Sequence, residues 1–190
     1  MISRPDSPRS SASIPRPDPS EYAPYCAKYI ALVVEQDVRT ALADNADKMQ
    51  ALLQTVTEFA SLLRYAPGKW TIREMIVHVT DVERIQSYRV LRIARGEMQP
   101  LAGFDPASYV AASHADQRPW DAIREEFSAV RDATLALFGN LPDDAWARRG
   151  IADGFPLSVR AAAYVIAGHG IHHCNLLREK YIPLMAAEEC

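Results

Sequence analysis

Residues 70–96 read WTIREMIVHVTDVERIQSYRVLRIARG and carry the clearest helix signal in the chain. Thr71 is a favourable N-cap residue, and Glu74 three positions later can complete a capping box with it. Apolar side chains then recur at spacings of three and four residues as far as Gly96, a residue type common just after a helix. The stretch predicts a long amphipathic helix that ends near Arg95.

Three more stretches repeat this periodicity, at about 36–63, 119–138 and 158–181. Apolar side chains at 22–34 suit a short helix packed across the main body, and Pro183 should end the last long helix. No stretch alternates apolar and polar residues as a half-buried strand would. The sequence therefore predicts an all-α fold, a four-helix bundle.

The lengths of the connections limit the order of the four helices. Pro67-Gly68 leaves only a short link, so the first two long helices should run antiparallel. Residues 97–118, with a turn near 107–111, form a long crossover after the second long helix. A crossover of this length lets the third helix start at either end of the bundle, so up-down-up-down and up-down-down-up both remain open.

The chain has 190 residues, of which 48% are hydrophobic, enough for one domain with a core. We place this domain at residues 21–183. Residues 1–20 are rich in Ser, Pro and Arg and are expected to form a disordered tail that adds nothing to the core. Residues 184–190 should form a short C-terminal tail.

Charge and apolar patterning argue against several classes of protein. The net charge is −3, with 21 basic and 24 acidic side chains, which disfavours a nucleic-acid partner. No apolar run approaches the roughly 20 residues of a membrane helix, and the first residues contain no apolar leader, so we expect a cytoplasmic protein. Cys26, Cys174 and Cys190 form no C-x-x-C pair and are expected to be reduced thiols.

Two histidines near the C-terminus suggest a metal site. His169 and His173 are four residues apart, so their side chains lie one above the other on a helix, within or at the edge of its apolar stripe. Burying two imidazoles on one turn is costly unless they share a ligand. His172 is rotated from His173 by roughly a quarter turn, so it should face solvent or lie behind the ligands.

His78, inside the predicted helix at 71–95, is the best candidate for a third ligand. Two imidazoles alone hold a divalent ion weakly, and His114 falls in a loop. Other metal and nucleotide sites lack their residues: Gly170 occupies the position of the general base in an H-E-x-x-H protease, and neither E-x-x-H pairs nor phosphate-binding glycine loops occur. A three-histidine site leaves coordination positions open, as reactive metal sites do.

Four stretches together resemble one known family: YAPGKWTIREMIVHVTDVER at 65–84, YRVLRIARG at 88–96, PLAGFD at 100–105 and IAGHGIHH at 166–173. Over residues 21–183 the chain is similar to the DinB-like, YfiT-like superfamily of metal-dependent enzymes. The resemblance implies an up-down-down-up four-helix bundle, frequent homodimers, and a zinc or nickel ion held at the positions of His78, His169 and His173. It also implies a thiol-dependent transferase or isomerase that uses a low-molecular-weight thiol such as bacillithiol, mycothiol or glutathione.

The function expected from these residues is that of an enzyme acting on a small-molecule substrate. The metal ion would activate a thiol or water, so that the protein transfers a small thiol to an electrophile or hydrolyses its substrate. Helpers could come from His172, from Asp105 and Tyr109 in the crossover, or from Asp81 and Glu83, although a solvated helix face explains the last two equally well. Two alternatives remain open: a non-catalytic metal-containing protein that binds small molecules or responds to stress, and histidines that only stabilise the bundle.

Overall fold

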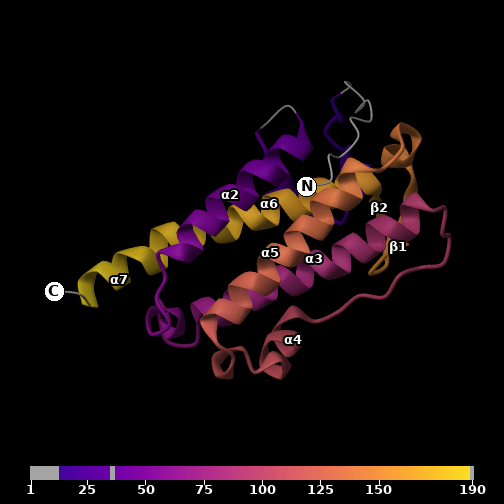
Figure 1. The fold of residues 1–190 in the computed structure, drawn as a ribbon. Coiled ribbons are helices and arrows are strands. Elements are labelled where there is room, and N and C mark those ends of the chain that lie inside the picture. The colour runs from indigo at the N-terminus through magenta and orange to yellow at the C-terminus, as the bar shows by residue number, and fades with distance from the viewer. Residues whose placement is uncertain (1–12, 35–36, 189–190) are drawn as a thin grey trace, which may run out of the picture.

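Four long helices make up the body of the protein in the computed structural model, which describes residues 13–34 and 37–188 (Figure 1). They are α2 (Val38–Gln54), α3 (Ile72–Ala94), α5 (Trp120–Gly139) and α6 (Val159–Leu176). The shorter elements are α1 (Ala27–Ile30), α4 (Pro106–Ser113), α7 (Ile182–Glu188), β1 (Arg149–Ala152) and β2 (Phe155–Ser158). The predicted four-helix bundle is confirmed.

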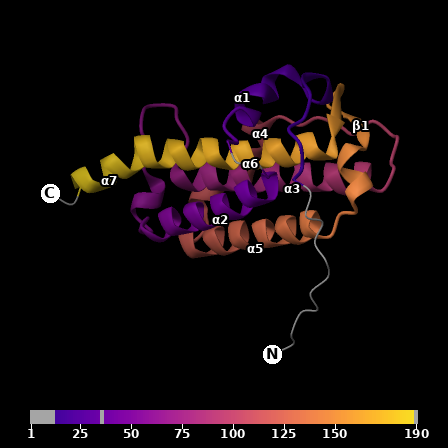
Figure 2. The same ribbon diagram turned by 90° about the horizontal axis from the view of Figure 1, so that it is seen from above.

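The long helices follow the up-down-down-up order. Both α2 and α3 pack against α5 and α6, so α2 and α3 lie diagonally across the bundle, as do α5 and α6. Figure 1 shows α3 and α5 running in one direction, with α2 and α6 running in the other. The long crossover, which contains α4, returns the chain along the bundle between α3 and α5. The short helix α1 packs on α6 (Figure 2).

Local signals begin α3 and α6, and end α3, where the sequence predicts. Thr71 Oγ1 accepts a hydrogen bond from the Glu74 N–H at 3.0 Å, and the Glu74 carboxylate accepts one from the Thr71 N–H at 2.9 Å, which confirms the capping box of α3. At the start of α6, Ser158 Oγ accepts a hydrogen bond from the Ala161 N–H at 3.0 Å. Gly96 follows α3 with a φ of +86°, a left-handed conformation that glycine adopts without steric conflict.

The first long helix is shorter than the predicted 36–63 segment, whose first residue lies outside the described part of the chain. The helix α2 ends at Gln54. Beyond it, the Trp120 indole donates a hydrogen bond to Val56 O at 2.8 Å, and the Trp120 N–H donates to the Glu58 carboxylate at 2.9 Å. These contacts from α5 hold the segment off a helical path, so tertiary structure overrides its apolar periodicity.

The β1–β2 hairpin departs from the predicted all-helical pattern. Its turn is Asp153-Gly154, with φ angles of +54° and +76°, and two-residue hairpin turns require such positive values. Antiparallel pairing begins at Arg149 opposite Ser158. The Asp-Gly pair is the sequence signal for this hairpin, but strands of four residues are too short to show a clear alternation.

The helical path continues to Glu188, so the prediction that Pro183 ends the last helix is wrong. A π-helical segment, Leu177–Tyr181, joins α6 to α7. This segment shifts the hydrogen-bond pattern, so Pro183 falls in the first turn of a new helix, where proline is tolerated. Residues 189 and 190 of the predicted C-terminal tail, including Cys190, lie outside the described residues.

Part of the N-terminal segment packs on the bundle, contrary to the expectation that residues 1–20 add nothing to the core; residues 1–12 lie outside the description. Ile14 is 6% exposed and belongs to an apolar core cluster, and the Tyr164 hydroxyl donates a hydrogen bond to Ile14 O at 3.2 Å. Arg16 donates to the carbonyl of the last residue of α1 at 3.0 Å. A single apolar side chain does little to the average composition of a segment, which is why composition missed it.

The core also contains a buried ion pair. Arg131 of α5 lies 2.8 Å from Glu83 of α3, and the two side chains are only 2% and 3% exposed. Arg131 also donates hydrogen bonds to Leu42 O and Asn45 Oδ1 of α2, at 3.1 and 3.2 Å. This network ties three of the four long helices together.

In the described part of the chain, every helix is too short or too polar to cross a membrane.

Candidate metal centre

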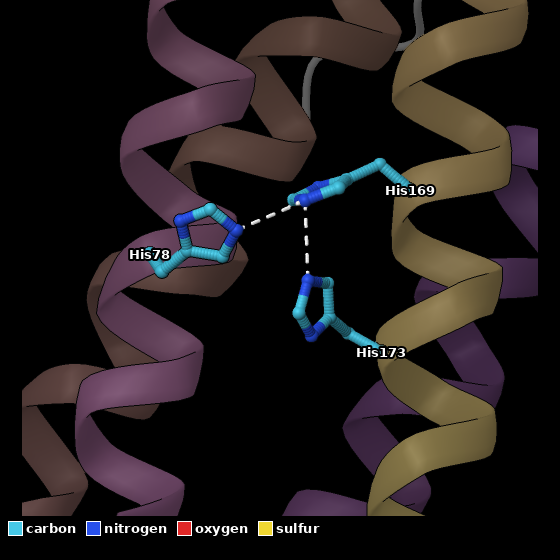
Figure 3. A group of neighbouring side chains, drawn as sticks. All are labelled: His78, His169 and His173. Atoms are coloured by element: carbon cyan, nitrogen blue, oxygen red, sulfur yellow. Dashed lines mark hydrogen bonds between the residues drawn. The ribbon is translucent and has the colours of Figure 1, made fainter. Parts of the chain in front are cut away.

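Three imidazoles from two helices meet between α3 and α6 (Figure 3). His78 Nε2 lies 3.0 Å from His169 Nε2, and His173 Nε2 lies 3.1 Å from the same atom. One nitrogen from each ring lies within 4.8 Å of the others, and all three side chains are buried. The structure therefore brings together the three histidines singled out in the sequence.

Glycines on both sides of His169 let α6 approach its neighbours closely. A Cβ atom on Gly168 would lie 1.9 Å from Tyr29 O, and a Cβ on Gly170 would lie 2.3 Å from Asn45 Oδ1. Both distances are far below van der Waals contact. Gly170 thus has a packing role at the position where an H-E-x-x-H protease carries its general base.

The three imidazoles are neutral at physiological pH. Burial lowers the pKa of His78 to about 4, with a smaller effect from His172. Burial lowers the pKa of His169 and of His173 well below the usual value, and the neighbouring histidines lower them further. Neutral rings keep a lone pair free for a metal ion, so no proton has to be removed when an ion binds at neutral pH.

The arrangement fits a divalent ion. Two nitrogens that each lie about 2.0–2.1 Å from a tetrahedral zinc ion are about 3.3–3.4 Å apart. Two of the three separations in the cluster, 3.0 and 3.1 Å, are close to that value, and the third is within 4.8 Å. Hydrogen bonding accounts for the cluster less well, because His169 Nε2 carries at most one proton and faces two other ring nitrogens. His173 Nδ1 is also buried without a hydrogen-bond partner. Imidazole suits both zinc and nickel.

Two aromatic rings cover the cluster, and sequence reasoning did not identify either. The Tyr29 ring of α1 packs edge-on against His169 at a centroid distance of 5.2 Å, and the Trp70 ring lies 4.8 Å from the His78 ring. Trp70 has a sequence signal, since it stands directly before the cap of the helix that carries His78. Tyr29 has none, because it reaches the site only through the packing of α1 on α6.

His172 lies beside the cluster but outside it, as its helical position predicts. Its side chain is exposed, and its ring contacts the rings of Tyr29 and His173 at centroid distances of 5.6 and 4.9 Å. Partial burial lowers the pKa of His172, and Lys28 lowers it slightly more. His172 is therefore mainly a neutral imidazole at the solvent edge of the site.

Asp105 and Tyr109, predicted as groups near the metal, have other contacts. The Asp105 carboxylate caps α4 by accepting hydrogen bonds from the N–H groups of Ala107 and Ser108 at 3.1 and 3.2 Å. Tyr109 is exposed, and its ring packs against Phe104 at a centroid distance of 5.2 Å. In the described residues, neither side chain hydrogen bonds to a histidine of the cluster.

The two acids that follow His78 also have local partners. Glu83 forms the buried ion pair with Arg131, so it stabilises the bundle rather than facing solvent. Asp81 lies 3.6 Å from Arg84 one turn along α3. Burial raises the pKa of Asp81, although the positive charge of Arg84 opposes this effect.

Comparison with known proteins identifies a family and a fold. The sequence profile of the DinB superfamily matches residues 41–177, a range that contains all three histidines. A comparison with curated protein sequences finds no match.

Solved structures that share the fold include the following two. YfiT from Bacillus subtilis, described as "a probable metal-dependent hydrolase with an unusual four-helix bundle topology", matches with a TM-score of 0.69 and 16% identity, over 88% of this chain and 92% of YfiT. A mycothiol-dependent maleylpyruvate isomerase matches with a TM-score of 0.63 and 16% identity, over 73% of this chain and 58% of the isomerase.

The fold and the cluster define a helical-bundle protein with a candidate three-histidine metal site between its second and fourth long helices. The chain belongs to the DinB superfamily.

Proposed function

We propose that this protein is a metal-dependent enzyme in which His78, His169 and His173 hold a divalent ion, zinc or nickel. The proposed reaction is transfer of a low-molecular-weight thiol to an electrophilic small molecule, or hydrolysis of a small substrate. The observation that carries this proposal is the convergence of three buried, neutral imidazole nitrogens within 4.8 Å of one another. The printed descriptions of YfiT and of the isomerase support metal dependence and thiol chemistry respectively.

A divalent ion held by these three imidazoles would supply a Lewis acid, which would lower the pKa of a water or thiol toward neutrality. The chain contributes the surroundings of that chemistry. The rings of Tyr29 and Trp70 pack against those of His169 and His78 and place aromatic surface beside the cluster. The exposed imidazole of His172 is the group beside the cluster that can accept a proton from an incoming thiol or water and pass it to solvent.

One observation favours a second candidate, a non-catalytic metal-containing protein that binds a small molecule. In the described residues, no carboxylate hydrogen bonds to the three imidazoles, so a fixed carboxylate base is lacking beside them. An exposed histidine can serve as a base only if it reaches the bound substrate.

For the whole protein we propose a cytoplasmic homodimer without a nucleic-acid partner. The net charge of −3 and the balanced mixture of basic and acidic side chains support the last point. Sedimentation velocity would test the dimer, and titration with labelled DNA and RNA would test the absence of nucleic-acid binding.

Elemental analysis followed by turnover assays tests the proposed function. Purified protein should contain about one zinc or nickel ion per chain, and it should consume bacillithiol, mycothiol or glutathione in the presence of an electrophile. The variant His173→Ala should lose both properties, whereas His114→Asn, at an exposed loop histidine with a φ of +49° that asparagine tolerates, should keep both. Stoichiometric metal without turnover of any thiol or hydrolysable substrate would favour the non-catalytic candidate.

A further inference from the structure

A pocket of about 310 Å³ opens beside the histidine cluster. His173 lies in its wall, together with Leu176 three residues further along α6 and Met75 three residues before His78 on α3. Trp70, whose ring lies 4.8 Å from the His78 ring, also lines it. The volume is at the lower end of the range for small-molecule sites, roughly 300–1,000 Å³.

Aromatic side chains form a fixed wall of this pocket. The Tyr181 hydroxyl donates a hydrogen bond to Trp70 O at 2.8 Å, which fixes the backbone of Trp70. The Tyr65 ring packs edge-on against the Tyr181 ring with centroids 5.0 Å apart. Because these side chains are held by one another, the pocket exists before a ligand arrives, and little ordering is needed on binding.

Among the described residues that line this pocket, Lys69 is the one with a lysine, arginine, aspartate or glutamate side chain. Its backbone is fixed, because its N–H donates to Ala66 O at 3.1 Å and its carbonyl accepts from Arg64 at 2.6 Å. The acids close by, Glu74 and Asp116, both pair with Arg64. No ion pair in the described part of the chain involves Lys69, so its ammonium group is available to a ligand.

We propose that this pocket binds the flat, apolar body of a small anionic molecule, with the carboxylate of that molecule at Lys69. The inference rests on the proposed function in one respect: a metal ion beside His173 would add positive charge to the pocket. Aromatic walls alone would also suit an organic cation. The Lys69 ammonium repels a cation, however, and no acid among the described lining residues offsets this repulsion.

Calorimetric binding of 2-naphthoate and of its neutral analogue 2-naphthamide tests the proposal. The parent protein should bind naphthoate more tightly than naphthamide. Lys69→Met should weaken naphthoate binding about tenfold, the effect expected for losing a hydrogen bond between charged groups, and should leave naphthamide binding unchanged. Lys69→Arg should retain most of the preference for the anion. Lys48→Met, which removes an exposed charge from α2 outside the pocket, should behave as the parent.

A substitution in the pocket wall tests where the two ligands bind. Metal analysis of the same samples tests whether binding depends on the ion. Tyr65→Ala should weaken both ligands, because it removes wall area that both contact. Equal affinity of the parent for the two ligands, or an unchanged naphthoate affinity in Lys69→Met, would overturn the proposal. A Lys69-dependent preference in protein that holds no metal would support the pocket while rejecting the metal-dependent function, and metal-loaded protein without the preference would reject the pocket alone.

Discussion

The turn of α6 that carries the histidines packs closely against its neighbours because its glycines have no side chain. Gly170 faces Asn45 and Arg131, and its missing side chain lets that buried network pass next to His169. Because the network also holds Glu83, the packing of this turn is coupled to the ion pair between α3 and α5. The position of His169 thus depends on this buried network as well as on its own contacts.

Gly170→Ala should destabilise the protein by about 1–3 kcal/mol, because a Cβ 2.3 Å from Asn45 Oδ1 forces the network to move. Urea unfolding of the metal-free protein measures the effect. Gly139→Ala is the matched control, since a Cβ there meets nothing within 4 Å. Equal unfolding midpoints for the two variants would contradict the close approach seen at Gly170.

Metal content should distinguish the three proposed ligands from the neighbouring His172. Removing His78, His169 or His173 leaves two imidazoles, which hold a divalent ion far more weakly than three, so each alanine variant should lose stoichiometric metal. His172→Ala should keep the metal and at most reduce activity, because its side chain lies outside the cluster. Metal analysis after identical mild chelation decides this. An empty His172 variant beside a loaded His173 variant would refute the ligand assignment.

At the level of elements, α3 connects the cap, the cluster and the crossover. Its first turn is held by Thr71 and Glu74, and the Thr71 hydroxyl also donates to Asp116 at 2.6 Å. His78 stands less than two turns from Glu74, so disorder in the first turn of α3 reaches the cluster.

Thr71→Ala should cost about 1 kcal/mol of stability, the usual value for losing an N-cap. It should also weaken metal binding, because the first turn of α3 positions Trp70 and His78. Thr71→Ser retains the capping hydroxyl and serves as the control. Thermal unfolding and competitive chelator titration measure the two effects, and parental values of both in the alanine variant would show that the cap has no role.

Over the whole molecule, the N-terminal segment contributes to stability through Ile14. Ile14→Ala should cost about 2–5 kcal/mol, as burial of this side chain in the core predicts. Ile151→Ala in β1 is the matched control, because Ile151 is 39% exposed and should cost much less. Chemical denaturation measures both variants. A loss of stability no larger at Ile14 than at Ile151 would restore the expectation that residues 1–20 add nothing to the core.

The buried histidines should make the stability of the metal-free protein depend on pH. Their pKa values are lowered in the folded state, to about 4 for His78, from a value near 6.5 in the unfolded chain. Between these two pKa values the unfolded state binds more protons than the folded state. The stabilising contribution of the neutral histidines is therefore fully present above pH ~6.5 and is lost as the pH decreases. Each histidine can contribute up to about 1.4 kcal/mol per pH unit. Urea unfolding from pH 7.5 to 4.5 should show this slope, and His173→Gln should flatten it; an unchanged slope in that variant would count against the burial effect.

Local chemistry made much of this protein predictable from its sequence. The capping box at Thr71, the cap at Ser158 and the stop at Gly96 act within a few residues, and the spacing of His169 and His173 fixes their common face. These features depend on backbone geometry close by in the chain, which is why the helices and the histidine pair could be expected in advance.

Tertiary packing alone decided the rest. The end of α2 depends on hydrogen bonds from Trp120, and the cover over His169 depends on α1 bringing Tyr29 to α6. The pocket at Lys69 likewise exists because Tyr181 binds the backbone of a residue far away in sequence. Such contacts join segments that share no local periodicity. The sequence by itself therefore determined which long helices form and which histidines share a face, and only the packing of those helices decided what surrounds the three histidines.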